Sequence, residues 1–162
     1  MKKILISACL AGDLVRYDGK RVPLTNILLS KWNQKGMLIN VCPEVSGGLK
    51  IPRLEAQIVN GTGQDVLEGK AKVVDIEGHD VTLFFIRGAQ YALRQAKKHK
   101  IEIAILKEKS PSCGVHHIYG GNFDSTLIPG VGVTTAILKQ RGINVFSENE
   151  LDRARMLLKI WF

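Results

Sequence analysis

Residues 101–114 read IEIAILKEKSPSCG, and this stretch decides how the rest of the chain is interpreted. Its first six residues form a short, largely apolar run that predicts a buried β-strand. The strand then gives way to a stiff, polar loop in which two serines and a proline precede a cysteine. A cysteine in such a loop raises the question of where the other two cysteines of the chain lie.

Three more short apolar runs predict buried strands: KKILIS at 2–7, MLINV at 37–41 and INVFS at 143–147. Helical patterns lie between them and after the last one. Strands that alternate with helices indicate an α/β fold, a three-layer, Rossmann-like arrangement around a mostly parallel sheet. Residues 56–76 contain two β-prone runs around a glycine-rich stretch and predict a small β-hairpin excursion. At 162 residues the chain is expected to form one domain, 1–162.

The predicted strands place all three cysteines at strand ends. Cys9 follows the first strand, Cys42 the second, and Cys113 the strand at 101–106. Ligands of parallel α/β sheets bind beyond the carboxyl ends of the strands. We therefore expect the three side chains to converge on one edge of the sheet.

Four interpretations of the cysteines remain open at this point. They can be inert buried residues, or ligands of a Cys₃His zinc site completed by His116, which follows Cys113 at C-x-x-H spacing. They can hold three irons of a four-iron cluster and leave the fourth iron open to substrate. Cys113 can also be a nucleophile that pairs with a histidine.

Polar residues beside the cysteines suit an active site. Glu44 comes two residues after Cys42 and is a candidate to move protons. Hydrogen bonding or proton relay is expected of two serines that flank Pro111, Ser110 and Ser112. The loop that follows the first strand contains three candidates to bind substrate in the pocket: Arg16, Tyr17 and Asp18. Gly130 and Gly132 precede a predicted helix and suggest an anion site at its N-terminus.

Composition narrows the function classes. A cysteine count of three and the lack of a signal-peptide pattern argue against a disulfide framework. No apolar stretch approaches the roughly 20 residues of a membrane span, so a soluble, cytoplasmic protein without a membrane partner is expected. The net charge of +8 is compatible with an RNA-binding module, but the 6% aromatic content and the lack of a recognised motif argue against nucleic acid. Nothing in the sequence predicts an oligomeric state.

The chain resembles a small bacterial and archaeal family known as a domain of unknown function, whose characterised relatives are thiouracil desulfurases. The motifs that carry the resemblance run in order along nearly the whole chain: SACLAG, VRYDG, VCPEVSGGL, GHDVT, AILKEKSPSCG, IYGGNF, GVGVTTAIL and GINVFSE.

The resemblance implies a [4Fe–4S] cluster held by Cys9, Cys42 and Cys113, with catalytic help from Glu44 and from Ser110 or Ser112. It also implies removal of sulfur, without net redox change, from a thiolated small molecule such as 2-thiouracil. The alternative is a non-enzymatic metal-binding domain, with zinc or a cluster, that serves as a sensor or scaffold.

Overall fold

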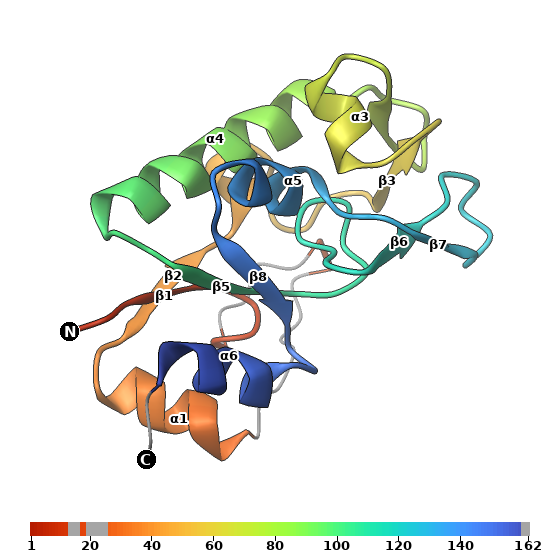
Figure 1. The fold of residues 1–162 in the computed structure, drawn as a ribbon. Helices are drawn as coiled ribbons and strands as arrows, with labels where there is room; N and C mark the ends of the chain where they lie inside the picture. The colour runs from red at the N-terminus through yellow and green to blue at the C-terminus, as the bar shows by residue number, and fades with distance from the viewer. Residues whose placement is uncertain (13–16, 19–25, 160–162) are drawn as a thin grey trace.

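Four short parallel strands form the central sheet of the computed structural model, which describes residues 1–12, 17–18 and 26–159 (Figure 1). They are β1 (Ile4–Ser7), β2 (Leu38–Val41), β5 (Ile103–Leu106) and β8 (Asn144–Ser147), in the order β2-β1-β5-β8. Each falls within or beside a run predicted from sequence. The side chains of β1 and β5 are buried throughout, as expected of strands covered on both faces.

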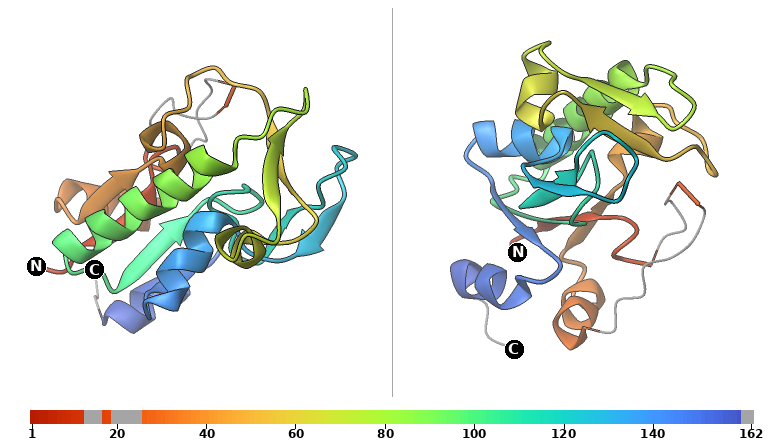
Figure 2. Two further views of the ribbon diagram at one scale, coloured as in Figure 1. Left: turned by 90° about the horizontal axis from the view of Figure 1, so that it is seen from above. Right: turned by 90° about the vertical axis from the view of Figure 1, so that its right-hand side faces the viewer.

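Helices cover both faces of this sheet and confirm the three-layer α/β prediction. On one face, α1 (Ile27–Gln34) and α6 (Leu151–Leu158) pack against a core that includes Ile4, Ile6 and Trp32. On the other face, α4 (Thr82–Lys98) and α5 (Val133–Gln140) lie side by side, as Figure 2 shows. Their buried side chains include Ala92, Ala96 and Leu138. None of the helices in the described ranges is both long and apolar enough to cross a membrane.

The predicted excursion is present as two antiparallel strands, β3 (Ala56–Val59) and β4 (Lys72–Asp75). Their connection contains a short helix, α3 (Gly63–Leu67), where only a glycine-rich stretch was predicted. Two more short elements lie where only loops were expected. One is α2 (Pro43–Ser46), and the other is a small hairpin of β6 (His117–Tyr119) and β7 (Leu127–Pro129).

Two glycines let α2 approach α4 closely. A Cβ atom at Gly88 of α4 would lie 1.9 Å from the carbonyl oxygen of Pro43, and one at Gly47 would lie 1.9 Å from that of Phe84. Only glycine allows backbones to come this near. The contact holds the segment that begins at Cys42 against the long helix α4.

The order of the strands reverses between β1 and β5. The chain passes from β1 to β2 on one side, and then places β5 on the other side of β1. Such a switch point opens a crevice at the carboxyl ends of the two strands, because their connections diverge. Cys9 follows β1 and Cys113 follows β5, so these two residues lie beside the crevice.

Candidate functional site

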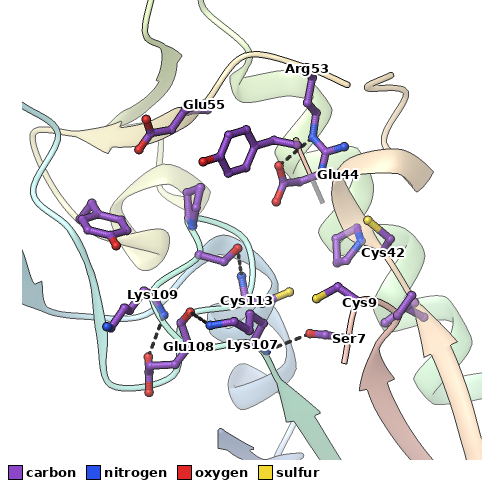
Figure 3. Close-up of a pocket in the computed structure, with 18 residues that line it drawn as sticks. Ser7, Cys9, Cys42, Glu44, Arg53, Glu55, Lys107, Glu108, Lys109 and Cys113 are labelled. Carbon is purple, nitrogen blue, oxygen red and sulfur yellow. Dashed lines mark hydrogen bonds and ion pairs between the residues drawn. The ribbon is translucent and has the colours of Figure 1, made fainter. Parts of the chain in front are cut away.

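A cavity of about 250 Å³ lies at the carboxyl ends of β1, β2 and β5, and all three cysteines line it. Figure 3 shows the sulfur atoms of Cys9, Cys42 and Cys113 facing a common space. The predicted convergence of the cysteines is therefore confirmed. The cavity is smaller than the roughly 300–1,000 Å³ typical of sites for drug-sized ligands, so it suits a small molecule.

Local backbone structure positions each cysteine. Cys9 lies in a tight turn, in which the N–H of Leu10 donates to the carbonyl of Ser7 at 2.9 Å. Cys42 directly precedes α2. Cys113 closes a turn around Ser110, whose Oγ accepts the N–H of Cys113 at 3.1 Å. Turns of this kind hold a side chain in one orientation, which a multi-ligand site needs.

The carboxylate of Glu108 organises the loop that carries Cys113. Its Oε1 accepts four backbone N–H groups, at 2.8 to 3.2 Å, from Lys109, Val115, His116 and His117. Burial acts to raise the pKa of Glu108, but these hydrogen bonds outweigh it and hold the pKa below its ordinary value. A buried, ionised carboxylate thus ties both ends of the loop together.

Burial raises the pKa of the Cys113 thiol far above its ordinary value. A hydrogen bond from the Ser7 hydroxyl opposes this rise, and the nearby Cys9, Glu44 and Cys42 add to it. The pKa of Cys42 is also raised, mainly by burial and further by the charge of Glu44. A hydrogen bond from the N–H of Val45 acts to lower it. Both shifts favour the protonated thiols, and a bound metal group would favour their thiolate forms.

Glu44 lines the same cavity and forms an ion pair with Arg53. The Nε of Arg53 donates to Oε1 of Glu44 at 3.1 Å, and the two side chains are only 7% and 19% exposed. Burial raises the pKa of Glu44, although the Arg53 charge acts against this shift. The predicted placement of Glu44 close to Cys42 is confirmed.

The structure separates the two candidate serines. Ser110 lines the cavity, and its Oγ accepts the N–H groups of Ser112 and Cys113, which leaves its own proton free to donate. Ser112 is completely buried, does not line the cavity, and shares a hydrogen bond of 3.0 Å with Thr134. The expectation that Ser112 reaches the site is wrong, because its side chain fastens the loop to α5.

The anion site expected at Gly130 and Gly132 is also not formed. The first N–H groups of α5, from Val133 and Thr134, donate to the carbonyls of Pro111 and Ser112. These donors hold the Cys113 loop and are not available to an anion.

Of the three residues expected to bind substrate, Tyr17 lines the cavity. Its carbonyl accepts the N–H of Arg53 at 2.7 Å, which attaches Tyr17 to the Arg53 segment. Asp18 is half-buried but does not line the cavity, so its predicted contact with substrate is not supported. Arg16 lies outside the described residues.

Several residues that line the cavity were not singled out from sequence: Ser7, Arg53, Glu55, Lys107 and Tyr119. Lys107 binds Glu148 at 3.0 Å, and its N–H donates to the Ser7 Oγ at 2.9 Å. These contacts join segments up to 100 residues apart. In the sequence, Ser7 and Lys107 could have been identified as site candidates because they lie at the ends of predicted strands.

His116 does not complete a zinc site with the cysteines. Its Nε2 binds Oε1 of Glu150 at 2.6 Å, and no histidine is among the described residues that line the cavity. Within the described part of the chain, no three His, Cys, Asp or Glu side chains are grouped closely enough to hold a single metal ion. Cys113 likewise has no histidine base in the cavity among the described residues, which argues against the nucleophile interpretation.

Comparison with known proteins accounts for this combination of fold and cysteines. The model of the 2-thiouracil desulfurase family matches residues 4–150. The chain belongs to the 2-thiouracil desulfurase family. A curated relative, the uncharacterised protein YbbK of Bacillus subtilis (strain 168), is 46% identical over 149 residues, which cover 92% of this chain and 97% of that protein.

Similarity to a solved structure agrees with the family match. The solved structure of a [4Fe-4S]-dependent thiouracil desulfidase, TudS, is similar to this chain with a TM-score of 0.89 and 41% identity. The match covers 98% of this chain and 99% of that one. The shared architecture confirms the α/β fold predicted from sequence.

The residues of this family member fit a four-iron cluster better than a single ion. Three thiols face one cavity, whereas a structural zinc ion needs four ligands in a tetrahedron. A cluster spreads its ligation over several irons, so three thiolates can hold three of them. Cys9, Cys42 and Cys113 are the residues that would hold it.

Proposed function

We propose that this chain is a [4Fe–4S]-dependent desulfidase that replaces the sulfur of a thiolated pyrimidine base with oxygen, without net redox change. Water supplies the oxygen, so that C=S and H₂O become C=O and H₂S. No electron donor or acceptor is needed, because the carbon keeps its oxidation state. The family match and the similarity to TudS support this reaction class.

The observation that carries the proposal is the meeting of three thiols in a cavity with room for a small ligand. A bound cluster with one iron free of protein ligands would supply a Lewis acid for the sulfur of the substrate. Lys107 also lines the cavity, and its ammonium group is paired with Glu148 at 3.0 Å.

Side chains of the cavity would then activate the water and transfer protons. Glu44 faces the cavity beside Cys42, and its carboxylate is placed to take a proton from the attacking water. Arg53 fixes the orientation of that carboxylate through the 3.1 Å hydrogen bond. Ser110 has its hydroxyl proton free, and can donate it to a polar atom of the base as the carbon becomes tetrahedral.

Aromatic and apolar side chains complete the walls of the cavity. Tyr17, Tyr119, Pro43 and Pro111 line it together with the charged groups. A flat heterocycle with one soft sulfur atom matches such a lining, because rings stack on aromatic faces and sulfur prefers iron to hard cations.

The test is conversion of 2-thiouracil by protein prepared and loaded with iron and sulfide without oxygen. Uracil and sulfide should appear in equal amounts, and protein without the cluster should form neither. A loaded protein that converts no thiolated base would refute the enzymatic proposal and favour a metal-binding domain without catalysis.

A further inference from the structure

Glu55 is a carboxylate that lines the cavity on the side away from the cysteines. Figure 3 shows its side chain across the cavity from the sulfur atoms of Cys9, Cys42 and Cys113. It lies on the segment that leads into β3, and its side chain is half-buried. A substrate whose sulfur points to the cysteines therefore turns its far edge toward the side of the cavity that carries Glu55.

No basic side chain among the described residues forms an ion pair with Glu55. Two basic side chains of the cavity are already paired, Arg53 with Glu44 at 3.1 Å and Lys107 with Glu148 at 3.0 Å. Lys109 lies beside Glu108, on the opposite side of the cavity in Figure 3. The carboxylate of Glu55 thus keeps acceptor capacity that the described protein groups do not use.

Among the described residues, Gln57 is the side chain that forms a hydrogen bond with Glu55, and it is held in a single orientation. Gln57 is only 3% exposed, and its Oε1 accepts the N–H groups of Gly121 at 2.9 Å and Phe123 at 3.3 Å. Its amide nitrogen must then face the other way, where it donates to Oε1 of Glu55 at 3.4 Å. This contact occupies one oxygen of Glu55 and leaves the other for a ligand.

We propose that Glu55, positioned by Gln57, determines substrate specificity by accepting a hydrogen bond from position 4, on the half of the base that is remote from its thiocarbonyl group. The oxygens of a carboxylate accept hydrogen bonds, so they attract an N–H or O–H donor and repel a carbonyl oxygen. The substrates favoured are therefore thiolated bases that carry a donor at this position. The inference rests on the proposed function, because it needs the sulfur to lie at the cysteines.

Two bases that differ at one group separate the effect of Glu55 from catalysis. 2-Thiocytosine carries an amino donor at position 4, where 2-thiouracil carries a carbonyl acceptor. Wild-type protein should show a higher kcat/KM for 2-thiocytosine. A hydrogen bond to a charged group contributes enough for a preference of about 10- to 100-fold.

The decisive variant is Glu55→Gln, because a glutamine amide both donates and accepts and so has no strong preference. In this variant, the kcat/KM for 2-thiocytosine divided by that for 2-thiouracil should fall by about 10- to 100-fold. The matched control is Glu77→Gln, which removes the same charge from an exposed position that does not line the cavity. Its ratio should equal that of the wild type.

An unchanged ratio in Glu55→Gln, with both bases still converted, would overturn the role of Glu55 and leave the proposed function intact. If the loaded wild type converts neither base, the proposed function fails, and titration calorimetry of the two bases decides the question of Glu55. A Kd ratio that shifts in Glu55→Gln supports the role in recognition. A Kd ratio that does not shift, or absence of binding to the wild type, refutes it.

Discussion

The guanidinium group of Arg53 donates a hydrogen bond to the carboxylate of Glu44 at 3.1 Å, and both side chains are largely buried beside Cys42. Arg53 lies in the irregular segment before β3, whereas Glu44 lies in α2, so the pair joins two segments of the cavity wall. Burial of one charge without the other is strongly unfavourable. The pair is therefore both a structural clamp and the device that orients the proposed proton acceptor.

Replacement of Arg53 by leucine should destabilise the fold by about 3 kcal/mol, because it leaves the Glu44 carboxylate buried without its cation. The double change Arg53→Leu and Glu44→Leu should regain much of this loss. Urea unfolding of the two single variants and the double variant measures the coupling. A loss below about 1 kcal/mol in Arg53→Leu would show that the pair behaves like an exposed ion pair.

Glu44→Gln should separate catalysis from cluster binding. Glutamine keeps the size and the hydrogen-bonding capacity of the side chain but does not take a proton. The variant should retain the iron and the visible spectrum of the wild type, while desulfurisation slows by about 10²–10⁴-fold. Full activity would remove Glu44 from the mechanism, and loss of the cluster spectrum would instead make it a ligand.

Glu108 should make the stability of the protein depend on acid pH. Its folded-state pKa lies below the usual value of 4.5, since four N–H donors outweigh the effect of burial. Its stabilising contribution is therefore present above that value and is lost as the pH falls through the folded pKa. Glu108→Gln should lower the unfolding free energy by about 1–2 kcal/mol at neutral pH, and the difference should shrink below pH 4.5.

Unfolding curves of wild type and Glu108→Gln at a series of pH values measure this difference directly. A gap between the two proteins that stays constant from neutral to acid pH would contradict the assignment of an ionised Glu108. The matched control is Glu102→Gln at an exposed position. Its unfolding free energy should stay close to that of the wild type at every pH.

Gly132 should tolerate no side chain. An added Cβ would lie 2.4 Å from the carbonyl carbon and oxygen of Ser112 and 2.8 Å from the nitrogen of Cys113. Gly132→Ala should destabilise the protein by about 1–3 kcal/mol and reduce the amount of cluster bound, because the Cys113 loop must move. Gly120→Ala is the control, since its Cβ would meet its nearest atoms only at 3.5 Å. Equal unfolding midpoints for both variants would contradict the close packing at Gly132.

The sheet and the convergence of the cysteines could be predicted because they depend on local signals. Apolar runs identified β1, β2, β5 and β8, and parallel strands bring their carboxyl ends to one edge. The short elements α2, α3 and β6–β7 were not predictable in the same way. The β6–β7 hairpin, for example, is held by Glu108 and Gln57, whose contacts with it span up to 66 residues of sequence.

The same physical difference divides the site. Cys9, Cys42, Glu44 and Cys113 lie in segments that follow predicted strands, so their positions could be inferred from the strand ends. Arg53 and Glu55 belong to an irregular segment before β3, and only the folded chain brings them to the cavity. Ser112, in contrast, was predicted to lie in the site but does not. Ser110 lines the cavity, whereas the hydroxyl of Ser112 bonds to Thr134.

The central claim is that Cys9, Cys42 and Cys113 together hold a four-iron cluster. The most direct test measures iron, acid-labile sulfide and zinc in protein prepared and reconstituted without oxygen, for the wild type and for Cys42→Ala. The account predicts about four irons and four sulfides for each wild-type chain, and little of either in Cys42→Ala, together with loss of colour and activity. Stoichiometric zinc without sulfide in the wild type, or an undiminished cluster in Cys42→Ala, would contradict it.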